Sequence, residues 1–246
     1  MAEAAFWGFV GASSLIVAAE IAFAFKLSRM VIGLIMAFGV GALIASVSFE
    51  LVVPALQSVE GWQVALGLAT GSLVFFIGDQ LIARMGGKNR KSPDGPDDGD
   101  GGDDSGLGIV LGTVLDGVPE SAVLGMSIVG GAGVSVALLA GFWVSNFPES
   151  LGSTVGMRKS GTSKNKIRLM WWGIIAVSAA AAALGFVILD NSSTLTGAFV
   201  ESFAAGALLT MIADEMAPKA YDRSAVYAGL ATVAGFCLAV FLTSLE

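Results

Sequence analysis

Hydrophobic stretches of about 20 residues recur along the whole chain, and they constrain its fold more than any other feature. A helix of about 20 apolar residues is needed to cross a bilayer core of roughly 30 Å. Hydrophobic residues make up 55% of the 246 residues and charged residues only 13%. The sequence therefore predicts an all-α membrane protein with eight transmembrane helices. The predicted spans are about 5–25, 31–53, 63–83, 107–129, 132–156, 169–189, 196–217 and 225–244.

The 13 Lys and Arg residues all lie in alternate connections between these spans, after spans 1, 3, 5 and 7. The other connections contain Glu60 and Asp190 and no basic residue. Connections rich in Lys and Arg remain in the cytoplasm. We therefore predict a multi-pass protein of the cell (plasma or inner) membrane with both termini outside the cytoplasm. The lipid bilayer is its expected partner, no nucleic acid is expected, and a homodimer is left open.

One connection, residues 86–106, differs from the rest in composition. It reads GGKNRKSPDGPDDGDGGDDSG and has almost no apolar residue to bury. Such segments do not form a packed core. We predict a disordered, acidic cytoplasmic loop inside a single transmembrane domain that covers residues 1–246. Weak attraction of cytoplasmic cations is the functional alternative for this loop.

Two segments of the chain resemble each other at an offset of 165 residues. Phe38–Glu50 reads FGVGALIASVSFE, and Phe203–Glu215 reads FAAGALLTMIADE. The first lies in predicted span 2 and the second in span 7, which cross the membrane in opposite directions. This predicts an inverted repeat of spans 1–3 and 6–8 around a central hairpin of spans 4 and 5, as is common in secondary transporters. Chance similarity between two Gly- and Ala-rich helices is the alternative.

Spans 4 and 5 each place a proline and a glutamate inside an apolar run, in DGVPES (116–121) and SNFPES (145–150). Asp116 and Glu120 are four residues apart, and Asn146 and Glu149 three apart, so each pair lies on one helix face. The connection between the spans is short, which makes them antiparallel neighbours with both motifs at similar depth. Each proline also leaves a carbonyl without its helical partner. We predict a cation site near the midplane.

The ligand types available narrow the ion. The chain has no histidine, and its one cysteine, Cys237, lies in the last span. Carboxylate, amide and carbonyl oxygens suit Mg, Mn and Ca, and also Zn or Fe(II) where carboxylates dominate. None of the basic residues lies deep in a span, so no Lys or Arg is expected to neutralise the buried acids. The structural alternative is a set of protonated acids that hydrogen-bond between helices.

At these residues the chain resembles the ZIP (Zrt/Irt-like) family of divalent metal transporters. The resemblance rests on the paired Pro-Glu motifs in consecutive spans, the eight spans and the variable loop after span 3. It implies that metal ligands stand at the matching positions of spans 4, 5 and 7, and Glu50, the acid of the first repeat copy, completes the candidate set. The candidate metal residues are Asp116, Glu120, Asn146, Glu149, Asp214, Glu215 and Glu50.

The chain departs from the family pattern in ways that bear on metal choice. Asp116 replaces the usual histidine of span 4, Gly117 an asparagine, and Ser145 the usual histidine of span 5. The glycine that follows Pro-Glu in the family is serine in both motifs. These departures remove every nitrogen ligand and leave the identity of the metal open among Zn, Fe, Mn and similar ions.

The leading functional hypothesis is a secondary transporter that moves a divalent metal cation into the cytoplasm. No P-loop is present, so ion gradients would drive it. No resident cofactor is expected, because the metal is the transported substrate. The alternative from another class is a non-transporting membrane metal sensor, or a degenerate transporter homologue with protonated structural carboxylates. An enzyme is not expected, since the chain has no histidine base and no recognisable catalytic arrangement.

Overall fold

The computed structural model describes residues 1–84, 104–129 and 133–245, and helices joined by short connections account for most of this part of the chain. The all-α prediction is confirmed for these residues, which contain no strand. The helices are α1 (Ala2–Ala24), α2 (Arg29–Val47), α3 (Val53–Ser58), α4 (Gly61–Arg84), α5 (Asp104–Met126), α6 (Val136–Lys159), α7 (Lys164–Asp190), α8 (Thr194–Met211), α9 (Ala217–Ser224) and α10 (Ala228–Thr243).

Five helical stretches of the described residues are long and apolar enough to cross a membrane. They are Ala2–Ala24, Arg29–Ser58, Gly61–Arg84, Lys164–Asp190 and the continuous stretch Thr194–Thr243. The helices α5 and α6, which carry the two Pro-Glu motifs, are not among them. The chain is therefore a helical protein with several potential membrane spans, and length and composition alone do not establish eight.

The predicted disordered loop 86–106 lies mostly outside the described residues. Its last three residues were assigned wrongly, because α5 begins at Asp104. A helix forms its backbone hydrogen bonds within itself, so it can continue beyond its apolar run. The helix can therefore begin before the apolar run from which span 4 was predicted.

Serine residues mark the start of several helices. The side chains of Ser28, Ser135, Ser163 and Ser193 each accept a hydrogen bond from the backbone N–H three residues later, at the first turns of α2, α6, α7 and α8. Such caps satisfy one of the amide groups that a helix N-terminus leaves without a partner. The caps fix where these four helices begin.

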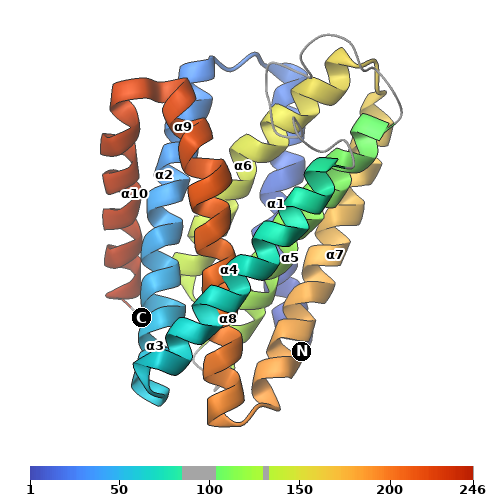
Figure 1. The fold of residues 1–246 in the computed structure, drawn as a ribbon. Helices are drawn as coiled ribbons and strands as arrows, with labels where there is room; N and C mark the ends of the chain where they lie inside the picture. Colours follow the sequence, from blue (N-terminus) through green and yellow to red (C-terminus); the bar gives the residue numbers. More distant parts are fainter. Residues whose placement is uncertain (85–103, 130–132, 246) are drawn as a thin grey trace.

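Glycines bring α2 and α10 into backbone contact. A Cβ atom built on Gly41 would lie 1.7 Å from the Thr232 carbonyl oxygen, and one on Gly235 would lie 1.9 Å from the Phe38 carbonyl oxygen. No larger residue fits at either place without moving a helix. Figure 1 shows α10 lying along α2 at one edge of the bundle.

The same arrangement recurs between α8 and α4. A Cβ atom on Gly206 would lie 2.1 Å from the Leu68 carbonyl oxygen, and one on Gly71 would lie 1.9 Å from the Phe203 carbonyl oxygen. Each of these residues stands 164 or 165 positions from its counterpart in the contact between α2 and α10. The two helix pairs therefore use equivalent positions of the two similar segments.

Two π-helical segments interrupt the long helices at equivalent positions. Ser48–Val52 lies between α2 and α3, and Ile212–Met216 lies between α8 and α9. A proline follows each of them, at Pro54 and Pro218. Because proline has no N–H to donate, the backbone before it adopts the wider hydrogen-bond pattern. The π segments hold three of the predicted metal residues, and such segments frequently occur at functional sites.

Candidate metal site between α5 and α6

The two Pro-Glu motifs meet at Glu120. The Asn146 Nδ2 atom donates a hydrogen bond of 3.0 Å to Glu120 Oε2, and the Ser145 hydroxyl donates one of 3.4 Å to Oε1. All three side chains are buried, and only 3% of Glu120 is exposed. The structure therefore places the motifs of α5 and α6 at the same level, which is the pairing that the sequence predicts.

Two further acids flank this contact. Asp116, which is 2% exposed, lies one turn before Glu120 on α5, and Glu149 lies one turn after Ser145 on α6. The spacing of Asp116 and Glu120 places both on one face of α5. Three buried carboxyl groups thus occur within one helical turn of the contact. A buried carboxylate is costly without a cation or hydrogen-bond donors, so this part of the bundle favours positive charge.

The helices around the contact hold it in place. A Cβ atom on Gly125 would lie 1.8 Å from the Ala182 carbonyl oxygen, so α5 packs directly on α7. The Ser150 hydroxyl donates a hydrogen bond to the Leu15 carbonyl oxygen of α1. Gly39 of α2 packs on the other side, because a Cβ atom there would lie 3.2 Å from Ser145 Cα. These contacts fix the rotation of both site helices.

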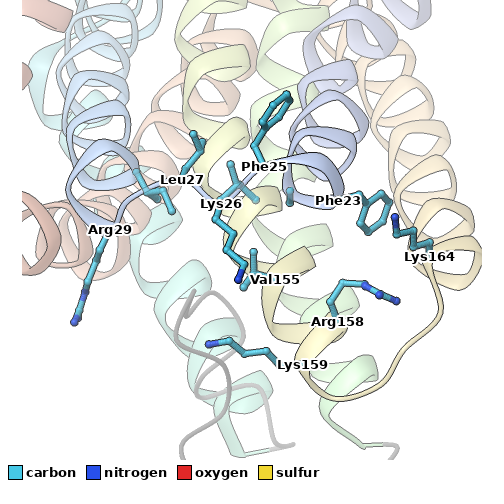
Figure 2. A pocket seen from close by; sticks show the side chains of 12 residues that line it. Phe23, Phe25, Lys26, Leu27, Arg29, Val155, Arg158, Lys159 and Lys164 are labelled. Carbon is cyan, nitrogen blue, oxygen red and sulfur yellow. The ribbon is translucent and has the colours of Figure 1, made fainter.

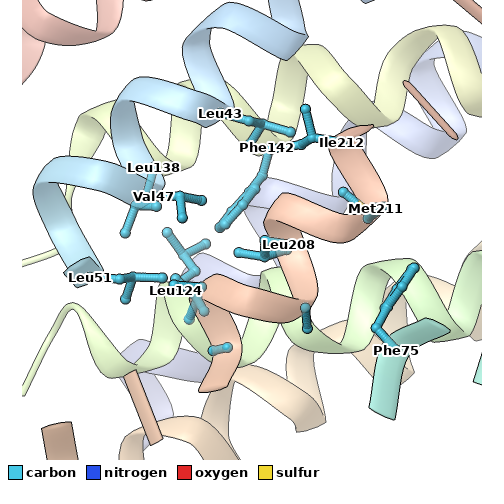
Figure 3. Packing of buried hydrophobic residues seen from close by; sticks show 14 of the residues in the cluster. Leu43, Val47, Leu51, Phe75, Leu124, Leu138, Phe142, Leu208, Met211 and Ile212 are labelled. Carbon is cyan, nitrogen blue, oxygen red and sulfur yellow. The ribbon is translucent and has the colours of Figure 1, made fainter. Parts of the chain in front are cut away.

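Apolar residues close one side of the contact. Figure 3 shows the Phe142 ring among Leu43, Leu208 and Ile212, side chains that come from α2, α8 and the following π segment. Phe142 lies one turn before Asn146 on α6 and is 2% exposed. This cluster places apolar side chains between the contact and the end at which α6 begins.

Buried polar side chains lie on the opposite side. Ser150, Ser153 and Thr154 follow the site on α6, and Thr113 precedes Asp116 on α5. The Thr154 hydroxyl accepts a hydrogen bond of 2.9 Å from the Trp171 indole nitrogen. Buried hydroxyl groups are unusual in a helix core unless they have partners. Their position gives the site a polar side and an apolar side along the same two helices.

The remaining candidate residues have partners elsewhere. Thr243 of α10 donates a hydrogen bond of 3.0 Å to Glu50. Glu215, which is 7% exposed, forms a 2.9 Å ion pair with Lys219, and Asp214 is exposed. In the residues that the structure describes, no three His, Cys, Asp or Glu side chains lie close enough together to hold a metal ion. The seven predicted residues therefore do not form one compact ligand shell.

The expectation that no basic side chain neutralises the acids of the spans was wrong for two of them. Lys219 lies one turn after Glu215 on the same helix face, where opposite charges attract. Arg168, at the start of α7, forms an ion pair with Glu20 of α1, with Nη2 and Oε2 2.8 Å apart. The long side chains of Lys and Arg reach acids that lie away from their own backbone.

No protein-family model matches the chain, and no curated protein matches it. The resemblance to the ZIP family therefore rests only on the motifs and on the pattern of spans.

Proposed function

We propose that this protein is a secondary transporter of divalent metal cations, of the kind that the ZIP-like motifs imply. The observation that carries the proposal is the buried contact between Glu120 and Asn146, because it joins the two Pro-Glu motifs inside a predominantly apolar helical protein. Polar and ionisable groups inside a membrane protein are costly, and they usually mark an ion pathway.

The chemistry of the contact suits a metal that binds reversibly. Asn146 offers its amide nitrogen to Glu120 in this arrangement. A half-turn of the amide group would present the oxygen instead, beside the Glu120 carboxylate and the Ser145 hydroxyl. Asp116 and Glu149 each lie one helical turn from the contact, and they would add carboxylates once the side chains and helices rearrange around the ion. Oxygen ligands of this type bind hard and borderline divalent ions.

The asymmetry of the surroundings supports alternating access. Under the proposed orientation, α6 runs from the outside to the cytoplasm, so the Phe142 cluster lies on the outer side of the site. The buried hydroxyl groups of Ser150, Ser153 and Thr154 lie on the cytoplasmic side. The conformation described here then corresponds to a state that is closed outward, and release of the metal would proceed along the polar side.

An inverted repeat supports the same proposal. The glycine contacts between α2 and α10 match those between α8 and α4 position by position. The π segments match as well. In transporters built from inverted repeats, the halves exchange conformations around a central site. We infer that α1 to α4 and α7 to α10 form the two repeats, that α5 and α6 form the central hairpin, and that eight spans cross the membrane.

The proposed orientation has a direct test by cysteine labelling. Cysteines introduced at Ser58 and Ser193 should react with a membrane-impermeant thiol reagent in intact cells, because both residues are placed outside. A cysteine at Ser163 should react only after the membrane is permeabilised. The experiment uses a Cys237→Ser background, which removes the native thiol. Labelling of Ser163→Cys in intact cells would reverse the topology and the direction of transport.

The oxygen-only ligand set leads to a prediction on selectivity. Asp116→His should shift metal preference toward Zn relative to Mn, because an imidazole nitrogen suits Zn better than Mn. We expect the ratio of Zn to Mn uptake to change by about 10-fold. This is the lower end of the effect on metal affinity of substitutions around a metal site. Competition between the two metals in vesicles measures it, and Asp190→His, at an exposed position outside the candidate set, serves as the control. An unchanged ratio would remove Asp116 from the ligand set.

The function itself is tested by metal uptake into proteoliposomes that contain the purified protein. Uptake of Mn, Fe(II) or Zn that depends on the protein supports transport. Saturable metal binding without uptake would instead support a membrane metal sensor. Neither binding nor uptake, in protein that remains folded, would support a degenerate homologue in which the acids are structural.

A further inference from the structure

A cavity of about 680 Å³ opens where the end of α1, the start of α2, the end of α6 and the start of α7 come together. Its volume is within the roughly 300–1,000 Å³ that is typical of ligand pockets. It is lined by residues of predicted cytoplasmic connections and helix ends, and it does not include any of the candidate metal residues. The proposed transport function leaves this cavity without a role.

The charged side chains among the described lining residues all have the same sign. The described residues that line it include five basic side chains and no acidic one, and the five are Lys26, Arg29, Arg158, Lys159 and Lys164. Figure 2 shows Lys26, Lys159 and Arg158 around the same space. Asp222 pairs with Arg29, and Glu20 attracts Lys164 from outside the lining. The five basic side chains together would attract a bound anion.

The individual contacts hold parts of this cluster in position. Arg158 donates a hydrogen bond of 3.2 Å to the Thr162 carbonyl oxygen, and the Lys164 ammonium lies 5.2 Å from the centre of the Phe23 ring. Arg29 forms a 2.8 Å ion pair with Asp222 of α9. The cluster is therefore drawn from four helix ends that are separate in sequence, and the fold gathers it.

The rest of the lining is apolar. Ile32 and Leu151 form a buried part of the wall, while Phe25, in the connection between α1 and α2, is 67% exposed. Figure 2 shows the Phe25 ring above Lys26. A free inorganic anion would gain nothing from contact with apolar walls or an exposed aromatic ring. A molecule with an anionic phosphate next to hydrocarbon uses both parts of the lining.

We propose that this cavity binds the headgroup of an anionic phospholipid, with the phosphate among Lys26, Arg158, Lys159 and Lys164 and the upper acyl chains against Phe25 and the apolar wall. The cavity lies at the ends of apolar helices, which is the level of lipid headgroups in a membrane. Basic pockets between transmembrane helices on the cytoplasmic side suit anionic headgroups. The inference requires a membrane protein but not metal transport.

The test measures lipid binding to the purified full-length protein in neutral detergent by native mass spectrometry. The probes are phosphatidylglycerol and phosphatidylcholine with the same acyl chains. We expect clear preference for phosphatidylglycerol in the wild type. The double variant Lys26→Gln with Lys164→Gln should weaken its binding about 30-fold, since each Lys near an anionic lipid contributes roughly fivefold.

A matched control removes the same charge elsewhere at the same end of the protein. Lys166→Gln combined with Arg84→Gln changes two described, exposed basic residues that do not line the cavity, and it should leave phosphatidylglycerol binding within about twofold. Equal loss in both double variants would overturn the proposal, because general surface charge would then explain the binding. Equal binding of the two lipids to the wild type would also overturn it.

Two further measurements distinguish a bound lipid from other possible occupants of the cavity. Inorganic phosphate at millimolar concentration should not displace phosphatidylglycerol, and displacement at that level would assign the cavity to a soluble phosphate compound. In lipid-free detergent, the Lys26→Gln and Lys164→Gln variant should have the same melting temperature as the wild type. With phosphatidylglycerol added, the variant should melt at a lower temperature than the wild type with the same lipid. A lower melting temperature in lipid-free detergent would instead identify a partner within the chain and contradict the lipid proposal.

Discussion

Glu120→Gln should reduce divalent metal uptake by about 100-fold or more while the protein still folds. The substitution keeps the size of the side chain and one acceptor oxygen for Asn146, while the new NH2 group can donate to the Ser145 hydroxyl oxygen. It removes the negative charge that would offset the charge of the metal in a buried site. Substitution of groups that only support a metal ligand lowers metal affinity by roughly 10- to 100-fold. Removal of the charge of a ligand should lower it by at least the upper value of this range. Uptake by proteoliposomes at low metal concentration measures the effect.

The matched control for this experiment is Glu20→Gln. Glu20 is also a helical glutamate with a defined partner, but it is half-exposed and paired with Arg168 away from α5 and α6. Its uptake should stay within about twofold of the wild type, as expected for loss of a surface ion pair. If Glu120→Gln transports as well as Glu20→Gln, with both proteins folded, then the contact between α5 and α6 is a structural hydrogen bond and not the metal site.

The second large effect concerns the glycine contacts between helices. Gly41→Ala and Gly206→Ala should each destabilise the protein by about 3 kcal/mol, the upper part of the range for overpacked sites. The added Cβ atom would lie 1.7 Å from the Thr232 carbonyl oxygen in one case and 2.1 Å from the Leu68 carbonyl oxygen in the other. These neighbours are backbone atoms, so relief requires that two helices move apart. Thermal unfolding in detergent measures the loss.

Gly173→Ala provides a control of the opposite sign. Gly173 lies inside α7, and a Cβ atom there would meet no atom within 4 Å. Alanine favours a helix over glycine by roughly 1 kcal/mol, so this variant should be as stable as the wild type or more stable. Equal stability of all three variants would mean that α2 does not pack on α10, nor α8 on α4, as closely as described. A loss in only one of the two contacts would argue against equivalent repeats.

Several features of this protein follow from the sequence alone. The all-α fold follows from hydrophobic runs of membrane length, because only a helix satisfies its own backbone hydrogen bonds in an apolar surrounding. The pairing of Glu120 with the motif of α6 follows from the short connection between two antiparallel helices. Local spacing was sufficient in this case, since a helix has a fixed rise and a fixed number of residues per turn.

The similarity of Phe38–Glu50 and Phe203–Glu215 also indicated equivalent segments, but it did not reveal what the glycines do. The role of Gly41 and Gly206 becomes evident only from their backbone contacts with α10 and α4. The two π segments were likewise absent from the prediction. The sequence shows the prolines that follow them, whereas the wider hydrogen-bond pattern is one of several ways in which a backbone can accommodate proline.

The partners of the other charged residues were decided by the tertiary structure. Glu215 binds Lys219, Glu20 binds Arg168 and Glu50 binds Thr243. The basic cavity is likewise assembled from four helix ends that no motif connects. The physical reason is that a sequence determines which face of a helix a residue occupies, while the rotation and register of neighbouring helices determine what that face meets. Long side chains can reach groups several ångströms away, so the packing of the helices determines which partner each of them contacts.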